Sequence, residues 1–287
     1  MKPPAFRYVV PRSLDEALAL LSQHGADAKL IAGGQSLVPM LNFRLLRPAL
    51  LVDISRLRAL AGITESTAGL RFGALTRHYM VETSALVADR LPLVAHAMTH
   101  VAHLAIRNRG TIGGSIAHAD PAAEWPALAM LYDAAIEVQS VRGTRIVAAK
   151  HFFTSVMSTA LEPDELITAI DFPARPEPNG WGFEEFARRH GDFAVAGVAV
   201  MLGRREGRVV DSRIALFGVG STPLRAPMAE AFLNDSTEFS DQVIDAVRAA
   251  VDPMNDLHAS AEYRRHLVGV LAKRAIHSAL RRVVPNL

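Results

Sequence analysis

Two pairs of adjacent glycines, each followed within two residues by a serine, constrain this chain more than any other feature of its sequence. They lie in residues 32–36 and 111–115, and an apolar, strand-like run precedes each pair. A diphosphate needs converging backbone N–H donors with no Cβ atom in the way, and paired glycines at strand ends supply both. A tight turn is the alternative for either pair alone, but the recurrence favours phosphate binding. Neither segment matches a dinucleotide fingerprint or a P-loop, so we expect the nucleotide in another fold.

The first 55 residues predict a β-α-β unit that leads into the first glycine pair. Ser13 and Glu16 form a capping box, after which leucines recur at helical spacing up to Gly25. A strand before that helix, and another that runs straight into Gly33, complete the unit. Such an opening suits a ligand-binding sub-domain, which we assign to residues 1–55. The strands expected here are residues 6–10, 29–32 and 52–54.

A second unit is expected over residues 56–175, with the second glycine pair inside it. Two of its strands form a hairpin around Gly143. A helix with one apolar face is expected before the glycine pair and a buried helix after it. The expected helices are residues 91–103 and 124–132, and the expected strands are residues 70–74, 135–141, 145–148 and 166–172.

Residues 173–180 are the best linker candidate, because they contain three prolines, Asn179 and Gly180. Beyond them we expect a third unit, residues 178–287, with a three-stranded antiparallel sheet and helices. The whole chain is therefore expected to belong to the α+β class. The expected strands are residues 181–189, 193–202 and 208–219, and helices follow from residue 227, the last of them over residues 261–284.

The composition excludes several classes of function. The chain has no cysteine, so disulfides, thiolate zinc sites, catalytic thiols and iron–sulfur clusters held by the chain itself are excluded. Its 31 Lys and Arg residues nearly balance 29 Asp and Glu residues, which argues against nucleic acid as the main partner. The amino terminus lacks the apolar core of a signal peptide, and no apolar stretch approaches the roughly 18 residues of a membrane span. We expect a soluble protein of the reducing cytoplasm.

Four stretches of the chain, taken together, resemble the medium subunits of the xanthine dehydrogenase and carbon monoxide dehydrogenase family of molybdenum hydroxylases. The resemblance spans nearly the whole chain. It implies an FAD-binding domain of the p-cresol-methylhydroxylase type, built from two α/β sub-domains, followed by a separate carboxy-terminal domain. The stretches are residues 32–39, 107–115, 119–121 and 187–194.

The resemblance also implies where the cofactor binds. The two glycine-bearing segments cradle its pyrophosphate. Asp120 and Glu124 fall where the family places polar contacts, and Val101 and Ile167 fall where apolar side chains pack on the flavin side of the site. No residue is assigned a catalytic or a metal-binding role. The cofactor-binding candidates are Ile31, Ala32, Gly33, Gly34, Gln35, Ser36, Leu37, Val101, Thr111, Gly113, Gly114, Ser115, Asp120, Glu124, Ile167, Asp192 and Phe193.

Two positions depart from patterns found in the family. Many members carry a lysine just upstream of the Arg-Arg-x-Gly-Asp motif, where this chain has Glu184 and Glu185. The departure leaves open how the flavin is contacted there. Gln35 replaces a histidine found in carbon monoxide-oxidising relatives, and is more similar to members that act on nitrogen heterocycles.

By the same resemblance, the chain is an FAD-binding electron-transfer subunit of a heteromeric molybdenum hydroxylase. A large subunit with a molybdenum cofactor takes two electrons from the substrate, and a small subunit with [2Fe-2S] clusters relays them. The FAD of this chain then passes them to an external acceptor. The resemblance implies a dimer of heterotrimers. The absence of cysteine fits this division, because this chain cannot hold the clusters itself.

Other functions stay open when the residues are considered alone. One is a free-standing flavin-dependent oxidase or dehydrogenase with its own substrate pocket, and another is a non-catalytic nucleotide-binding scaffold. His96, His100 and His103 recur at helical spacing and could present a metal face, but a partly buried helix face is favoured. Ser36 as a hydrolase nucleophile is disfavoured, because it lacks the G-x-S-x-G elbow.

The segment from residue 188 to residue 193 allows two interpretations of each side chain. Phe193 could shield the flavin ring or fill a core, and neither is favoured. Asp192 is favoured slightly as a turn former over a site residue. Arg188 and Arg189 are favoured as a solvated pair over a functional one.

Overall fold

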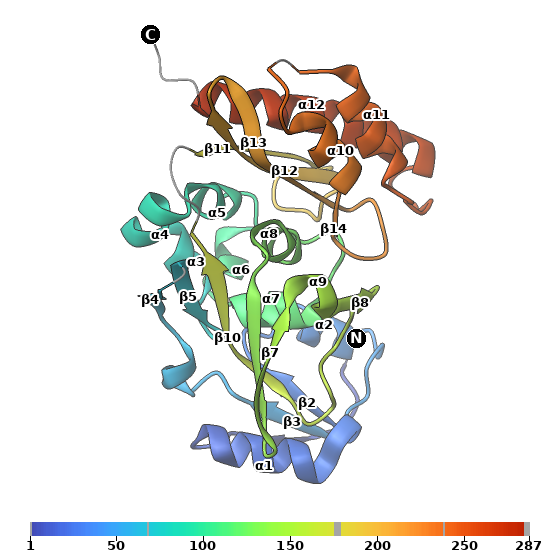
Figure 1. Ribbon diagram of the computed structural model, residues 1–287. Coiled ribbons are helices and arrows are strands. Elements are labelled where there is room, and N and C mark those ends of the chain that lie inside the picture. The colour runs from blue at the N-terminus through green and yellow to red at the C-terminus, as the bar shows by residue number, and fades with distance from the viewer. Residues whose placement is uncertain (1, 68, 175–178, 238, 284–287) are drawn as a thin grey trace.

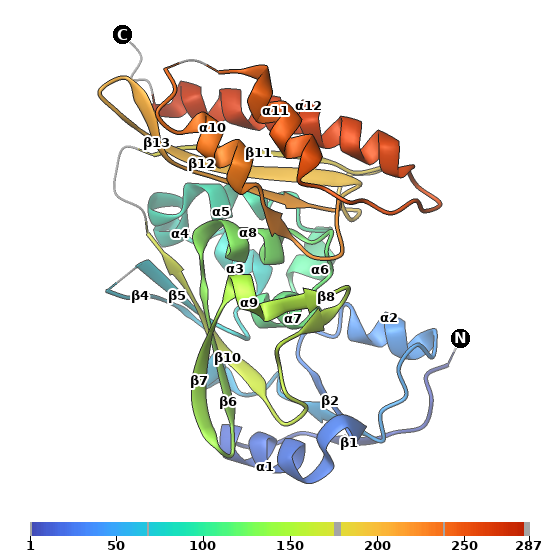
Figure 2. The same ribbon diagram turned by 45° about the vertical axis from the view of Figure 1, so that its right-hand side comes forward.

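The computed structural model describes residues 2–67, 69–174, 179–237 and 239–283. Figures 1 and 2 show three layers stacked along the long axis of the molecule: an amino-terminal sub-domain, a central sub-domain and a carboxy-terminal domain. The chain is of the α+β class, as expected, with a separate sheet in each layer. In the residues described, no helix has both the length and the apolar character needed to cross a membrane.

The amino-terminal sub-domain is the predicted β-α-β unit. Its sheet has the order β1-β3-β2, and neighbouring strands are parallel. The Ser13 hydroxyl caps α1 by accepting a 3.1 Å hydrogen bond from the Glu16 N–H, and the apolar face of α1 is buried against the sheet. The elements are β1 (Arg7–Val9), α1 (Leu14–His24), β2 (Ala28–Ile31), α2 (Leu37–Asn42) and β3 (Leu50–Asp53).

The central sub-domain is built on a five-stranded antiparallel sheet with the order β4-β5-β10-β6-β7. Its core contains Phe72, Trp125 and Phe172, whose rings pack edge to face with centroids 5.5 to 6.0 Å apart. The strands are β4 (Ile63–Glu65), β5 (Gly69–Gly73), β6 (Ala135–Ser140), β7 (Gly143–Ala148) and β10 (Leu166–Pro173), with a small hairpin of β8 (Phe153–Ser155) and β9 (Ser158–Thr159). The helices are α3 (His78–Glu82), α4 (Ala85–Arg90), α5 (Pro92–Ala97), α6 (Leu104–Arg107), α7 (Ile112–His118), α8 (Glu124–Tyr132) and α9 (Ala149–Phe152).

The carboxy-terminal domain is an antiparallel sheet with the order β11-β12-β13-β14, and its helices cover one face (Figure 2). The other face packs on the central sub-domain, because Phe183 and Phe217 belong to the same buried core as Trp125. A shared apolar core fixes the two domains relative to each other. The elements are β11 (Asn179–Phe186), β12 (Ala196–Arg205), β13 (Arg208–Phe217), β14 (Leu224–Arg225), α10 (Pro227–Leu233), α11 (Asp241–Ala249) and α12 (Ala261–Val283).

The structure corrects two predictions of secondary structure. The predicted three-stranded sheet has a fourth strand, β14, whose two residues are too few to show a periodic pattern. The continuous helix predicted over residues 91–103 is wrong, because α5 ends at Ala97 and Ala102 has a φ of 46°, which a continuing helix cannot accommodate. Of the predicted linker, residues 175–178 lie outside the described residues.

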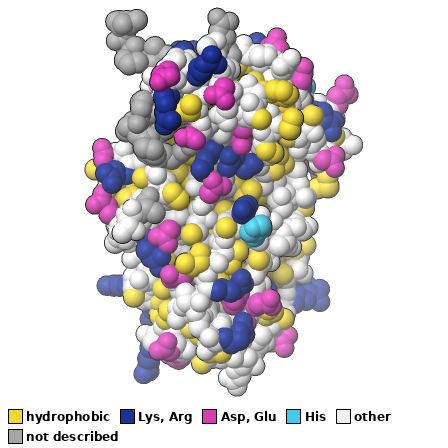
Figure 3. Space-filling view, viewed as in Figure 1, with side chains coloured by type: hydrophobic (Ala, Val, Ile, Leu, Met, Phe, Trp, Pro, Cys, Tyr) yellow, Lys and Arg dark blue, Asp and Glu magenta, His cyan; other side chains and the backbone are white. Residues whose placement is uncertain are grey.

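The surface mixes both signs of charge. Figure 3 shows basic and acidic side chains interspersed over the face seen in Figure 1. Arg71, for example, lies 2.7 Å from Glu137 and 2.6 Å from Asp171. This face therefore lacks the basic field with which proteins bind a nucleic-acid backbone.

Two glycines let α12 lie directly on β11. A Cβ atom on Gly182 would lie 1.9 Å from the Ala275 carbonyl oxygen, and one on Gly180 would lie 2.0 Å from that of Ala279. Any side chain at either position would push the helix backbone away from the strand. The packing of the longest helix in the described chain thus depends on the absence of two side chains.

We expect Gly182→Val to lower the free energy of unfolding by about 2–4 kcal/mol, because the branched side chain overpacks the contact between β11 and α12. Urea unfolding followed by circular dichroism would measure the change. Thr144→Val places the same side chain at an exposed position on β7, and should change stability by less than about 0.5 kcal/mol. Equal stabilities for Gly182→Val and the wild type would contradict the packing described.

Candidate cofactor site

The first glycine pair forms the turn between β2 and α2. Gly34 has a φ of 73°, a conformation that glycine adopts at little cost. The Gln35 side chain closes the turn, because its Nε2 donates a 2.8 Å hydrogen bond to the Gly33 carbonyl oxygen. Within the described chain, the amide N–H groups of residues 33–36 donate to no other protein group. Neighbouring backbone donors are therefore free to bind an anion.

The second glycine pair lies in the first turn of α7, so the prediction that it ends a strand is wrong. Thr111 is the N-cap, and its Oγ1 accepts a 3.1 Å hydrogen bond from the Gly114 N–H. The amides of Ile112 and Gly113 donate to backbone carbonyls just beyond β5. These N–H groups are thus already paired. What the segment can offer a ligand is the exposed surface of Gly114 and the half-buried Ser115 hydroxyl.

The two glycine-bearing segments are in direct contact. A Cβ atom on Gly33 would lie 2.2 Å from the Arg109 carbonyl oxygen and 2.9 Å from the Gly110 Cα atom. Gly110 is packed in turn against the His78 ring, which a Cβ atom would approach to 2.8 Å. The free donors of residues 33–36 therefore lie beside the segment that leads into α7.

Asp120 and Glu124 are buried at the beginning of α8. The Asp120 Oδ1 accepts a 2.9 Å hydrogen bond from the Ala122 N–H, which fixes the turn into the helix. Burial raises the pKa of Glu124 to about 7, and the charge of Asp120 adds to this effect. A carboxyl group that keeps its proton near neutral pH can donate a hydrogen bond as well as accept one.

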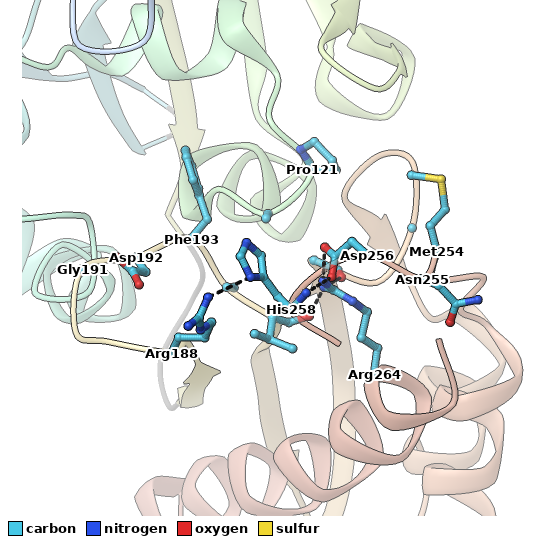
Figure 4. Close-up of a pocket in the computed structure, with 15 residues that line it drawn as sticks. Pro121, Arg188, Gly191, Asp192, Phe193, Met254, Asn255, Asp256, His258 and Arg264 are labelled. Carbon is cyan, nitrogen blue, oxygen red and sulfur yellow. Dashed lines mark hydrogen bonds and ion pairs between the residues drawn. The ribbon is translucent and has the colours of Figure 1, made fainter. Parts of the chain in front are cut away.

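The loop between β11 and β12 carries Asp192 and Phe193 to a pocket of about 560 Å³, which is also lined by Pro121. Phe193 is 58% exposed, so the core-filling interpretation is wrong for this chain, and Figure 4 shows the ring projecting from the loop. The Asp192 N–H donates a 3.1 Å hydrogen bond to the Arg189 carbonyl oxygen. Asp192 thus forms the expected turn and presents Phe193 to the pocket.

The opposite wall of this pocket comes from the segment between α11 and α12 and from Arg264 in the first turn of α12, neither of which was among the sequence candidates. The buried Arg264 guanidinium donates to two backbone carbonyls and, at 2.6 Å, to Asp256. The exposed Arg188 shares a 2.9 Å hydrogen bond with His258 (Figure 4). Arg188 belongs to the Arg-Arg-x-Gly-Asp motif, whereas no motif marks Asp256, His258 or Arg264, because their spacing in the sequence resembles that of an ordinary charged helix end.

The apolar candidates divide into two groups. Val101 and Ile167 are buried in the core of the central sub-domain, with 7% and 5% of their surface exposed. Ile31, Ala32 and Leu37 are half-buried around the first glycine turn.

Among the sequence candidates, the structure brings the two glycine-bearing segments together, whereas the Phe193 loop meets the central sub-domain just beyond Asp120.

Comparison with known proteins identifies the family. Residues 4–175 match the family described as the FAD binding domain in molybdopterin dehydrogenase, and residues 181–279 match the CO dehydrogenase flavoprotein C-terminal domain. The chain belongs to the FAD-binding medium subunits of the molybdenum hydroxylases. This confirms the family that the four sequence stretches indicated.

Individual medium subunits match over their full length. The chain is 45% identical to the 6-hydroxypseudooxynicotine dehydrogenase complex subunit alpha of Paenarthrobacter nicotinovorans, covering 100% of this chain and 98% of the relative. It is 39% identical to the carbon monoxide dehydrogenase medium chain of Hydrogenophaga pseudoflava, covering 97% and 98%. A solved carbon monoxide dehydrogenase from Hydrogenophaga pseudoflava that lacks the Mo-pyranopterin moiety superposes with a TM-score of 0.96 and 41% identity, covering 99% and 100%.

Just upstream of the Arg-Arg-x-Gly-Asp motif, this chain has a carboxyl group with one buried oxygen. Glu185 lies on β11 and alternates with residues that face α12, and its Oε2 has no hydrogen-bond partner among the described residues. Burial, together with the charge of Glu124, raises the pKa of Glu185 to about 9. Ionising both carboxyls costs free energy, because burial and the repulsion between two like charges both disfavour the charged forms. Because Glu124 belongs to α8, the pair spans the junction between the two domains.

The three histidines that could have presented a metal face do not share one helix. His96 belongs to α5, His100 to the turn beyond it, and His103 precedes α6. His96 packs on Trp181 and His100 on Phe183, with ring centroids 5.2 and 4.9 Å apart. They form an aromatic contact with β11. Among the residues described, no three His, Cys, Asp or Glu side chains are grouped so that they could hold a metal ion.

We expect the stability of this medium subunit to fall as pH rises from about 5 to about 9, owing to the carboxyl pair. The folded state retains protons on Glu124 and Glu185 that the unfolded chain releases near the ordinary glutamate pKa of 4.5. The stabilisation is therefore complete below that value, and is lost as pH rises through the raised pKa values.

Glu185→Gln cannot ionise and should reduce this slope, raising Tm at about pH 9 by roughly 2–4 °C and much less at about pH 5. Glu184→Gln, one residue away on the other face of β11, is the matched control and should keep the wild-type slope. Thermal melts across the pH range would test this. Parallel Tm curves for Glu185→Gln and the wild type would show that the pair does not couple to folding.

Proposed function

We propose that this medium subunit binds one FAD non-covalently, collects electrons delivered by iron–sulfur clusters of a partner subunit, and passes them to an external acceptor. The observation that carries the proposal is the contact of the two glycine-bearing segments beside the free N–H groups of residues 33–36. Such a site offers what a diphosphate requires: converging donors and no Cβ atom between them and its oxygens. The chain has no cysteine with which to attach a flavin.

The proposed roles of the residues follow from their chemistry. The amides of residues 33–36 hold the pyrophosphate, and the bare surface of Gly114 lets it approach α7, where the Ser115 hydroxyl adds a donor. Val101 and Ile167 exclude water on the flavin side. When bound, the FAD supplies the capacity to accept and release two electrons, while the protein supplies position and electrostatics.

The polar candidates would adjust the electrostatics around the bound flavin and would take no part in a reaction step. Asp120 and Glu124 offer carboxyl oxygens next to the cofactor, and the raised pKa of Glu124 lets it act as a hydrogen-bond donor near neutral pH. Asp192 sets the turn that presents Phe193, and the exposed ring is free to cover the flavin. In place of a lysine, Glu185 gives this wall of the site a group that is uncharged while it keeps its proton.

We propose a p-cresol-methylhydroxylase-type arrangement of the FAD-binding region, with sub-domains over residues 1–55 and 56–175 and the carboxy-terminal domain over residues 178–287. The separate parallel and antiparallel sheets of the first two units support these boundaries. The partners would be a large subunit with a molybdenum cofactor and a small subunit with [2Fe-2S] clusters, assembled as a dimer of heterotrimers in the cytoplasm. The absence of cysteine supports the division, since clusters must then lie on another chain.

One observation favours an alternative function. The pocket at Phe193 is large enough for a small molecule, as a free-standing flavin-dependent oxidase with its own substrate would require. Its lining includes Arg188, Asp192 and His258. Full-length similarity to subunits of complexes favours the electron-transfer function over this one.

Gly34→Val should abolish FAD binding, because a branched side chain disfavours the positive φ that shapes the turn with the free amides, and its Cβ would crowd Val38 Cγ2 at 3.3 Å. Gly143→Val is the matched control, since Gly143 also has a positive φ, of 127°, but lies at a hairpin with nothing within 4 Å of an added Cβ atom. The ratio of flavin to protein after purification would be measured for both, with circular dichroism as a check of folding. A folded Gly34→Val chain with full FAD content would place the site elsewhere.

A further inference from the structure

We infer that Arg107 is a positioning residue of the proposed FAD site, because it holds in place the segment that joins the turn of residues 33–36 to the Phe193 loop. The inference rests on the proposed function and names a residue that sets the two parts of the site relative to each other. The joining segment is residues 101–110, and the Phe193 loop is residues 187–194.

The joining segment contacts a part of the proposed site at each end. At one end, the Arg109 carbonyl oxygen lies against Gly33. At the other end, a Cβ atom on Gly191 would lie 2.8 Å from the His103 ring. Gly191 has a φ of 86°, a conformation that glycine adopts at little cost, and Figure 4 shows it on the loop that leads to Phe193. A shift of the joining segment would therefore move one part of the site relative to the other.

The joining segment has little regular structure of its own. Its helix α6 is a single turn of four residues, and helices this short are not stable without tertiary contacts. Just before the helix, Ala102 has a φ of 46°, which is unfavourable for a residue with a side chain. The position of this segment therefore depends on contacts with the rest of the central sub-domain.

Arg107 supplies such contacts through four hydrogen bonds. Its Nε and Nη2 donate to the two Glu82 carboxylate oxygens at 2.8 and 3.1 Å. Its Nη1 donates to the Val101 and Ala102 carbonyl oxygens at 3.1 and 2.9 Å. The side chains of Arg107 and Glu82 are only 12% and 24% exposed. A planar guanidinium can bond a carboxylate at two points and reach two carbonyl oxygens as well, whereas the ammonium of a lysine is a single point of charge.

Glu82 belongs to a helix that also holds the far end of the joining segment. It is the last residue of α3, and His78 is the first. The His78 N–H donates a 3.1 Å hydrogen bond to the Gly110 carbonyl oxygen, and the His78 ring packs on Gly110. Loss of the Arg107 bonds should therefore release the end next to the Phe193 loop, while the end next to Gly33 stays held. FAD should still bind, in a site whose flavin end is altered.

The test compares Arg107→Lys with Arg145→Lys in the full chain. Arg145 lies on the edge strand β7 and forms the same kind of pair, since its Nε and Nη2 donate to the Glu165 carboxylate at 2.7 and 2.6 Å. It also donates to the Ala160 carbonyl oxygen at 2.8 Å. Both substitutions keep the positive charge and remove the bidentate geometry. We expect both to lower Tm, so that a general loss of stability is matched between them.

Amide hydrogen exchange of the flavin-free chain measures the Phe193 loop directly. We expect Arg107→Lys to raise the exchange rate of residues 187–194 by about tenfold, in proportion to the loss of a charge-assisted hydrogen bond. Arg145→Lys should leave this loop at the wild-type rate. Wild-type exchange of the loop in Arg107→Lys would overturn the inference.

Visible circular dichroism of the FAD-loaded chain measures the effect on the cofactor. A flavin ring is itself planar and symmetric, so its signal depends on how the surrounding protein groups are placed around it. We expect Arg107→Lys to retain FAD at the wild-type ratio to protein and to lose part of this signal, and Arg145→Lys to keep it. A wild-type chain without FAD would overturn the proposed function and the inference together. An FAD-loaded Arg107→Lys chain with the wild-type signal would overturn the inference alone.

Gly191→Ala disturbs the same contact from the side of the loop and leaves the Arg107 bonds in place. Its Cβ atom would crowd the His103 ring, so we expect the same partial loss of the visible signal with FAD retained. Gly207→Ala is the matched control, because Gly207 also has a positive φ, of 79°, with nothing within 4 Å of an added Cβ atom. A folded Gly191→Ala chain that carries FAD and keeps the wild-type signal would show that the Phe193 loop does not depend on the joining segment.

Discussion

The approach of the Gly33 backbone to the Arg109 carbonyl oxygen holds the candidate site together. An added Cβ atom would meet that oxygen at 2.2 Å, so the absence of a side chain allows two segments from different sub-domains to touch. Gly110 extends the same packing to the buried His78 ring, which accepts a 2.9 Å hydrogen bond from Trp125. The position of the free amides thus depends, through backbone contacts, on the aromatic core of the central sub-domain.

The carboxy-terminal domain depends on the same core. Phe183 and Phe217 bury their rings with Trp125, while Glu124 and Glu185 form a carboxyl pair across that junction. A desolvated pair of acids opposes folding whenever both ionise. Apolar burial therefore fixes how the domain that carries Phe193 sits against the FAD-binding domain, and the acids make that junction sensitive to pH.

Much of the fold could be predicted because local signals agree with the tertiary packing. The Ser13 cap of α1 and the buried α8 fall where the sequence indicated, although the Glu16 carboxylate accepts its hydrogen bond from the Arg12 N–H and not from that of Ser13. The place of the glycine pair at residues 113–114 could not be predicted, since a Gly-Gly pair gives the same signal at a strand end and in a helical turn capped by Thr111. The break at Ala102 and the strand β14 have no local signal, because contacts distant in sequence determine them.

Part of the candidate site could likewise be predicted from the sequence, and part of it could not. Gly33 and Gly34 could be found because steric demand dictates the residue type, and the resemblance to the family added the positions around them. Arg264 and Asp256 line the pocket at Phe193, yet nothing in their spacing distinguishes them from a solvated pair. The near-neutral pKa of Glu124 arises from burial, which only the packed structure creates.

The central claim is that this chain is the electron outlet of a complex and not its substrate-oxidising subunit. The most direct measurement follows the assembled complex, depleted of flavin and supplied anaerobically with its own substrate, by electron paramagnetic resonance and by steady-state assay. The account predicts that molybdenum and the iron–sulfur clusters are still reduced, that turnover with the natural acceptor falls by about 10²-fold or more, and that an artificial one-electron dye partly restores it. Unreduced clusters, or substrate oxidation by the isolated chain at about 1 s⁻¹ or faster, would contradict it.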